Sequence, residues 1–275
     1  MRERVFSAAP ERLRARAFAA AAWEGLSLAF RIAPRLFRAN LRIRYRRSPL
    51  GALWLLMPAA GAALVSSQIV GGRTGAVPGL DLPYPAFVLV GIILWQLLVE
   101  TVQAPLQQLN AARHIVSRTP VPHEAFVLAG VFEALLACAL RLLLLALPVL
   151  LLVGASPGPA LLMLPLTLAA LAMLGLGLGL LVAPLGLLYD EVQPALSLFI
   201  ALGLFLSPVL YPATKFRALA FNPVTPLIEA SRNLLTGRPA PLAEAALVGA
   251  ASMLLLAFAW LFYRLAQSHV VARLG

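Results

Sequence analysis

Six long apolar segments occupy most of the chain between residues 50 and 263. A helix of about 20 apolar residues crosses the roughly 30 Å hydrocarbon core of a lipid bilayer. The segments lie near residues 50–71, 86–104, 125–153, 160–187, 195–212 and 243–263. This pattern predicts an all-α integral membrane protein with six transmembrane helices.

The net charge of the chain, +11, is concentrated at its N-terminus. Residues 1–47 contain 12 arginines and three glutamates and so supply +9 of it. Strongly basic proteins often bind nucleic acid, but a basic flank before the first membrane helix is an ordinary topology signal. Charged residues make up only 12% of the chain, against about 25% in soluble domains. We therefore expect membrane lipids, and no nucleic acid, as partners.

The other positive charges indicate the orientation. With the N-terminus inside, the predicted inner segments carry 16 Lys and Arg residues and the outer segments carry five. This bias follows the positive-inside rule. We expect a multi-pass protein of the cell (inner) membrane with both termini cytoplasmic. Its parts would be a cytoplasmic N-terminal region at residues 1–48, a six-span domain at 49–265 and a cytoplasmic tail at 266–275.

The stretch before the first span predicts an amphipathic helix. Its basic residues recur at spacings of three and four and so share one helical face: Arg35, Arg38, Arg42 and Arg46. Apolar residues such as Leu36 and Phe37 fall elsewhere, which suits a helix lying in the membrane interface. Pro34 would start it and Ser48-Pro49 would end it. The alternative is a basic flank that only sets the topology.

A proline-rich segment from Pro212 to Pro241 joins the fifth and sixth spans. Residues 224–235 predict one short helix that lies at the membrane face or dips into it. Non-helical backbone at membrane depth must be shielded by protein. We therefore expect this outer re-entrant segment to pack against the outer ends of the spans.

The residues needed for several kinds of catalysis are missing. Lys215 is the only lysine, and no glycine-rich loop precedes it, so the chain has no P-loop for ATP and Mg²⁺. Asp81 and Asp190, the only aspartates, are far apart, and the three histidines lack zinc-protease spacing. We expect no catalytic residue, no metal site and no cofactor in this chain, which would not itself be an enzyme.

Three charged residues, Glu100, Glu133 and Arg141, fall well inside predicted spans, where charges are rare and often functional. Arg141 would either pair with Glu100 or Glu133 or line a path with them, and both alternatives stay open. In the fourth span, Gly175 and Gly179 form a small-xxx-small pair that favours close helix packing.

Four sequence strings, taken in order, resemble polysaccharide-exporting ABC permeases. The family comprises type-2 exporters of O-antigen (a part of lipopolysaccharide), capsule and teichoic acid chains. The strings are residues 41–54 (LRIRYRRSPLGALW), 83–87 (PYPAF) with Gly91 and Trp95, 207–212 (SPVLYP), and Asn222-Pro223 with 226–232 (PLIEASR). The resemblance implies a homodimer of permeases and a separate ABC nucleotide-binding subunit that holds ATP and Mg²⁺.

The resemblance also implies roles for particular residues. The second inner loop, at about 105–124, would dock into the ATPase through a short coupling helix; the alternative is a solvated basic loop. The coupling residues would be Arg113, His114, Ile115, Val116, Ser117 and Arg118. The interfacial helix would be a cytosolic gate. An outer gate would contain Asn222, Pro223, Glu229 and Arg232, and the path candidates are Trp54, Trp95, Glu100, Glu133, Arg141 and Tyr211.

The function that these features predict is ATP-driven export of a lipid-linked polysaccharide or related glycolipid. Three alternatives remain. One is a drug or small-lipid exporter of the same type. Another is an ion-coupled secondary transporter that uses Glu100, Glu133 and Arg141. The third is a membrane scaffold with no transport role.

Overall fold

The computed structural model describes residues 15–46, 56–62, 64–65, 82–116, 121–156, 158–212, 219 and 221–274. Within this part the chain folds into helices, with no strand. The helices are α1 (Ala15–Arg46), α3 (Tyr84–Val116), α4 (His123–Arg141), α5 (Leu147–Leu152), α6 (Leu164–Leu188), α7 (Val192–Phe205), α8 (Val224–Thr236) and α9 (Leu242–Leu274). A π-helical turn (Leu142–Ala146) joins α4 to α5, and a 3₁₀ turn (Pro159–Met163) precedes α6.

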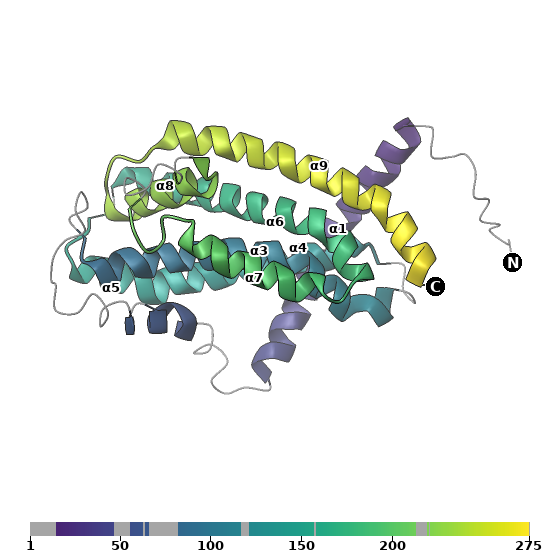
Figure 1. Cartoon of the computed structure of the whole chain (residues 1–275), viewed down its shortest axis with the longest axis horizontal. Helices are drawn as coiled ribbons and strands as arrows, with labels where there is room; N and C mark the ends of the chain where they lie inside the picture. The colour runs from purple at the N-terminus through teal and green to yellow at the C-terminus, as the bar shows by residue number, and fades with distance from the viewer. Residues whose placement is uncertain are drawn as a thin grey trace, which may run out of the picture.

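Four long, apolar helical segments run alongside one another (Figure 1). Each is long and apolar enough to cross a membrane: Tyr84–Ala111, His123–Leu152, Pro159–Leu188 and Leu242–Ala266. They correspond to the second, third, fourth and sixth predicted spans. The chain is therefore a multi-pass membrane protein, and these four predictions are confirmed.

The other two predicted spans differ in outcome. Residues 56–62 and 64–65 are helical, but most of the predicted first span at 50–71 lies outside the described residues. The fifth, predicted at 195–212, is helix α7, which has 14 residues and ends at Phe205. Its predicted C-terminal boundary was wrong, because Leu206–Tyr211 form turns around Pro208. The count of six spans stays a prediction.

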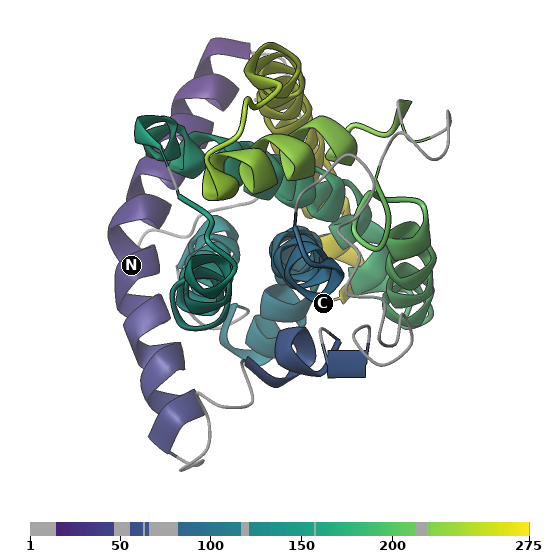
Figure 2. The same cartoon turned by 90° about the vertical axis from the view of Figure 1, so that its left-hand side faces the viewer.

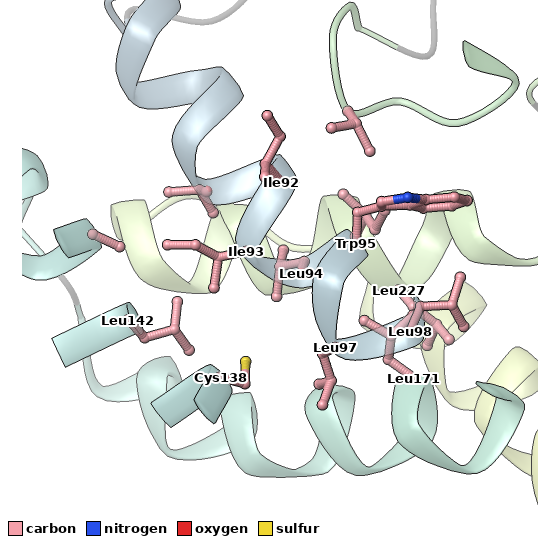
Figure 3. Packing of buried hydrophobic residues seen from close by; sticks show 14 of the residues in the cluster. Ile92, Ile93, Leu94, Trp95, Leu97, Leu98, Cys138, Leu142, Leu171 and Leu227 are labelled. Carbon is pink, nitrogen blue, oxygen red and sulfur yellow. The ribbon is translucent and has the colours of Figure 1, made fainter. Parts of the chain in front are cut away.

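Helix α3 lies at the centre of the bundle. In its most apolar stretch 78% of the residues are buried, against 17% in α9. Figure 3 shows why: side chains of α3 lie among Cys138 of α4, Leu171 of α6 and Leu227 of α8. Cys138 is a free, buried cysteine. The hydrophobic core thus forms around α3, which fixes this helix relative to α4, α6 and α8.

The close packing predicted from Gly175 and Gly179 is confirmed. A Cβ atom added at Gly175 would collide with the Thr101 side chain, and one added at Gly179 would collide with the Val102 carbonyl oxygen. Both contacts join α6 to α3. Small residues let two membrane helices approach until their backbones touch, so these glycines set the separation of α3 and α6.

Helices α7 and α9 present apolar side chains outward. On α9, Leu247, Leu254 and Phe258 are exposed, and α7 has no buried residue. Exposed apolar faces of this size are unusual on soluble proteins. They suit helices that contact lipid acyl chains or another membrane-embedded chain.

Helix α8 lies across one end of the bundle, as Figure 2 shows. Its extent, Val224–Thr236, confirms the short helix predicted at 224–235. The helix ends at Gly237, whose φ of 73° is left-handed and therefore favours glycine. Helix α8 packs on α3, α6 and α9, as the sequence led us to expect. Its depth in the membrane stays a prediction.

Helix α1 runs across the bundle rather than along it (Figure 2). The predicted start at Pro34 was wrong, because α1 is helical from Ala15 and Pro34 lies inside it. The preceding stretch is rich in alanine, the strongest helix former. Proline removes one backbone hydrogen bond, which does not end a helix of 32 residues here.

Candidate functional site

The arginines predicted to share a face of α1 are exposed where their side chains are described. Arg35, Arg38 and Arg42 are exposed, whereas the side chain of Arg46 lies outside the described part. Arg31 extends the same face by one turn, because it precedes Arg35 by four residues, and it is also exposed. Arg31 was not predicted, although the same four-residue spacing identifies it.

The opposite side of α1 is attached to α4. Ala29 and Ala33 are fully buried, which lets the two helices approach closely. The Asn40 side-chain amide donates a hydrogen bond of 2.7 Å to the Glu133 carboxylate on α4. One turn away, the rings of Phe37 and Phe132 meet edge to face with centroids 6.1 Å apart. Helix α1 is thus amphipathic and held against a membrane span. Its role as a gate stays a prediction.

A second attachment involves the first half of α1. The guanidinium of Arg264 on α9 occupies the place where a Cβ at Gly25 would lie. Arg264 also forms an ion pair with Glu124 at the start of α4, with Nε and Oε1 2.7 Å apart. Its guanidinium lies 5.5 Å from the centre of the Trp260 ring. Gly25, Glu124 and Arg264 therefore join α1, α4 and α9 at one end of the bundle.

The contacts of Arg141 bear on its two predicted roles, which were an ion pair with Glu100 or Glu133 and a place on a path with them. Its guanidinium donates to the Glu100 carboxylate, with Nη2 and Oε1 2.5 Å apart. The side chain of Arg141 is 4% exposed and that of Glu100 is 32% exposed. Glu133 is held by Asn40 of α1 instead. Arg141 is therefore a buried partner of Glu100, while Glu100 itself reaches an accessible surface of α3.

The backbone widens directly after Arg141. Residues Leu142–Ala146 form a single π-helical turn, and Pro148 follows within α5. Such turns are rare inside helices and concentrate at functional sites. The extra residue in the turn also adjusts the helix before a proline that cannot donate a backbone hydrogen bond.

Polar side chains follow one face of α3, and as a set they were not predicted. They are Gln96, Glu100, Gln103, Gln107 and Asn110. Their spacings of four and three residues alternate, so they fall on one narrow line along the helix. We call this line the polar stripe. Its signal is visible in the sequence, since Gln96, Glu100 and Gln103 interrupt the apolar segment 86–104 and the same spacing leads on to Gln107 and Asn110.

The stripe lies on a side of α3 that is less covered than the rest. All five of its members are half-buried or exposed, whereas Leu98 and Val102, which face α6, are buried. Gln107 donates a hydrogen bond of 2.9 Å to the side chain of Gln103. Polar groups on a membrane helix normally face protein or water rather than lipid. The stripe is therefore a candidate surface of a polar path.

The predicted outer-gate residue Arg232 is the centre of a buried cluster. It is 2% exposed. Its guanidinium lies 3.7 Å from the centre of the Phe87 ring on α3 and donates a 3.0 Å hydrogen bond to the carbonyl oxygen of Pro208. A Cβ at Gly91 would meet both Arg232 and Val209. Burial lowers the pKa of the Arg232 guanidinium from its usual value, and the Glu229 carboxylate opposes that shift.

Asn222 connects the end of α7 to the start of α8. Its amide donates a 2.7 Å hydrogen bond to the Leu206 carbonyl oxygen, and its Oδ1 accepts one of 2.9 Å from the backbone N–H of Val224. Nearby, the Tyr84 hydroxyl donates to the carbonyl oxygen of Leu210 at 3.0 Å. Pro223 lies between Asn222 and Val224 in the chain, and it is exposed. The three separate strings at 83–91, 207–212 and 222–232 thus meet in one place.

The positions of the other predicted path residues, Trp95, Tyr211 and Trp54, give no support for a place on a path. Trp95 is buried on α3, and its ring lies beside Gly203 of α7. Figure 3 shows the Trp95 ring on the side of α3 away from Cys138. Tyr211 is half-buried, and Trp54 lies outside the described residues. Trp95 therefore packs α3 against α7, as an ordinary core side chain does.

The predicted coupling loop at 105–124 needs correction. Helix α3 continues through Pro105 to Val116, so much of this range is helical and continuous with the second span. Arg113, His114, Ile115 and Val116 form the last turn of α3, beyond the membrane-crossing segment that ends at Ala111. Their side chains, and residues Ser117 and Arg118, lie outside the described part. Docking to an ATPase stays a prediction.

Comparison with known proteins identifies the family. A family model described as ABC-2 type transporter matches residues 35–236, a range that contains Arg35, Arg38 and Arg42 of α1, the polar stripe and the Arg232 cluster. No curated protein matches the chain. The chain therefore belongs to the ABC-2 type transporter family, in which it is the membrane subunit of an ABC transporter and works with an ABC ATPase.

Proposed function

We propose that this chain is the permease of an exporter that moves a lipid-linked polysaccharide or related glycolipid outward across the cytoplasmic membrane. ATP and Mg²⁺ are held by the separate ATPase. The observation that carries the choice of cargo is the polar stripe of α3. A path for lipophilic drugs would be mostly apolar with few polar groups, whereas a glycan needs hydrogen-bonding partners along its whole length.

The chemistry of the stripe suits sugar hydroxyls. Each glutamine or asparagine amide offers both donors and acceptors, so it exchanges hydrogen bonds with a hydroxyl group in either direction. The stripe has four amides and one carboxylate, which keeps its charge low. A sliding uncharged glycan would meet similar partners at each turn of α3.

A homodimer is supported by α7. This apolar helix has no buried residue within one chain, so a large part of its surface is available to a second copy. Two copies would place two polar stripes around one path, which a single chain with its few spans cannot enclose. In this arrangement α1 is the gate on the cytosolic side, and α8 with its Asn222 and Arg232 contacts is the outer gate.

A matched pair of substitutions on α3 tests the cargo. Gln103→Leu removes one amide of the stripe. Gln108→Leu makes the same change off the stripe, where the side chain packs near Gly130 of α4. Each variant is expressed in a host that lacks its own copy, and surface glycan is quantified at equal permease abundance. We expect Gln103→Leu to lower export several-fold and Gln108→Leu to leave it near normal.

The rival transport functions predict other results. A lipophilic-compound exporter would tolerate Gln103→Leu and show no change in surface glycan when the chain is deleted. An ion-coupled transporter would lose all flux with Glu100→Gln and keep it when the ATPase is inactivated. Either pattern would overturn the proposed function.

A further inference from the structure

Helix α1 lies close to α4, but a cavity lies between it and α9. It packs on α4, where Asn40 donates to Glu133. The cavity is apolar, has a volume of about 300 Å³, and is lined by residues that include Leu26 of α1 and Ala257 of α9. A helix over a cavity has fewer packing contacts to lose when it moves. The position of the first half of α1 therefore depends more on individual contacts such as the one with Arg264 of α9.

Gly25 leaves room on α1 for the Arg264 guanidinium. The sequence before Gly25 is rich in alanine, and glycine is a much poorer helix former than alanine. A Cβ atom at this position would overlap the end of the Arg264 side chain. The arginine therefore explains why this position departs from alanine: its guanidinium lies against the backbone of α1.

The same guanidinium holds the start of α4. Its Nε lies 2.7 Å from Oε1 of Glu124, and its Nη2 is the atom nearest to the Cβ position at Gly25. The side chains of Arg264 and Glu124 are only 17% and 8% exposed, and the Trp260 ring, 5.5 Å away, adds a cation–π contact. A guanidinium is planar and rigid, so its nitrogens move together. A displacement of Glu124 is therefore passed to the backbone of α1.

Glu124 is also joined to the predicted coupling loop. It is the last residue of that loop, at 105–124, and it lies in the first turn of α4. The other end of the loop is the last turn of α3, which ends at Val116. A short connection of this kind holds the two helix ends at the same end of the bundle. A movement of the loop by the ATPase would therefore displace the start of α4, and Glu124 with it.

We propose that Arg264 is a positioning residue that relays movement of the coupling loop to the gate helix. The ATPase shifts Glu124 at the start of α4, the Arg264 guanidinium follows, and α1 swings about its second attachment at Asn40. The inference rests on the proposed roles of α1 and of the loop, and it is independent of the cargo. It gives Gly25 a function, because Gly25 is the point at which the relay touches α1.

Two substitutions separate the relay from the fold. Gly25→Ala displaces only the flexible end of the Arg264 side chain and improves the helix propensity of α1, so it should not lower the melting temperature. Arg264→Lys keeps a positive charge beside Glu124 but has no planar group that reaches both partners. Ser27→Ala is the matched control, because it also raises the helix propensity of α1 and lies at an exposed position.

The measurement uses the full chain with its ATPase in membrane vesicles. A cysteine introduced by Leu26→Cys, in the lining of the cavity, reports movement of α1 through its rate of reaction with a maleimide. The parent chain without this change corrects for Cys138. Trapping the ATPase with ADP and vanadate should change the rate several-fold in the wild-type and Ser27→Ala backgrounds. Gly25→Ala and Arg264→Lys should each remove most of that change and still co-purify the ATPase as wild type does.

The possible outcomes separate the relay from a structural contact and from the proposed function. Gly25→Ala combined with Arg264→Lys should be no worse than either change alone, because both break one contact. An unchanged nucleotide response in both single variants would overturn the relay, since α1 would then move without Arg264. A large fall in melting temperature in Gly25→Ala, or loss of its ATPase, would also overturn it, because the contact would then be structural.

The wild-type chain tests the roles on which the relay rests. A wild-type chain that binds the ATPase but shows no nucleotide response at Leu26→Cys would overturn the gate role of α1, and the relay with it. A normal nucleotide response in a transporter that exports no glycan would overturn the proposed cargo and still support the relay.

Discussion

The Arg141 guanidinium on α4 and the Glu100 carboxylate on α3 meet at 2.5 Å inside a bundle of apolar helices. The two residues are 41 positions apart, and each would be costly alone at membrane depth. Their different exposures give them different roles. Arg141 is enclosed, whereas Glu100 is part of the polar stripe.

Breaking this pair from one side should be harmful, and removing it entirely should be less so. Arg141→Met leaves the Glu100 carboxylate without its partner. Because the Glu100 side chain is 32% exposed, we expect a loss of stability below the roughly 3–5 kcal/mol that an unpaired, fully buried charge costs. The double variant Arg141→Met with Glu100→Gln should recover most of the thermal stability, measured by size-exclusion chromatography after heating. A double variant as unstable as Arg141→Met would contradict a structural role for the pair.

Arg232 should be harder to replace by lysine than by methionine. Lysine keeps a buried positive charge but loses the planar stacking on Phe87 and the reach to the Pro208 carbonyl. Methionine fills similar space without a charge to desolvate. We expect melting temperatures in the order wild type, Arg232→Met, Arg232→Lys. Arg238→Lys, at a half-buried position just after α8, is the control and should change little.

The contact of α6 with α3 should not accept even a methyl group. Gly179→Ala forces the new Cβ against the Val102 carbonyl oxygen, and overpacking of this kind costs about 1–3 kcal/mol. Gly158→Ala adds the same methyl group in open space and should be neutral. The measurement is the melting curve of each variant in the same detergent. Coincident curves for Gly179→Ala and Gly158→Ala would mean that α3 and α6 move apart without a measurable loss of stability.

The attachment of α1 to α4 should depend on an acceptor at position 133. Glu133→Gln keeps an oxygen that accepts from the Asn40 amide, whereas Glu133→Leu leaves that amide without this bond, at a cost of about 1–3 kcal/mol. We expect Glu133→Leu to make α1 more sensitive to limited proteolysis in membrane vesicles. Equal proteolysis of the two variants would show that the apolar contacts of Phe37 and its neighbours hold α1 unaided.

Residues 113–118 should be needed for binding the ATPase. A chain with these six residues scrambled, still correctly inserted in the membrane, should lose the ATPase that co-purifies with wild type at a near one-to-one ratio. The reason is position: the last turn of α3 extends past the membrane-crossing segment. Retention of the ATPase by the scrambled variant would place the docking surface elsewhere.

Helix existence could be read from the sequence because membrane spans are long and uniformly apolar. The boundaries could not. Pro34 and Pro105 are both inside helices, since helix propensity on either side outweighs the loss of one hydrogen bond. The end of α7 at Phe205 depends on turns around Pro208 that are stabilised by Asn222 and Arg232, which lie later in the chain.

The parts of the candidate sites that could be predicted are those made of residues close together in the sequence, on a single helix. Four-residue spacing identified the arginines of α1, and the same rule applied to α3 would have found Gln103 and its neighbours. Long-range pairs were not accessible. Nothing in the sequence joins Glu124 to Arg264, or chooses Glu100 over Glu133 as the partner of Arg141, because the choice depends on how α1, α3 and α4 are rotated about their axes.

The brevity of α7 has a consequence for the membrane around it. Fourteen residues rise about 21 Å, which is less than the roughly 30 Å thickness of the hydrocarbon layer. Such hydrophobic mismatch is relieved by local thinning of the bilayer or by association with another chain.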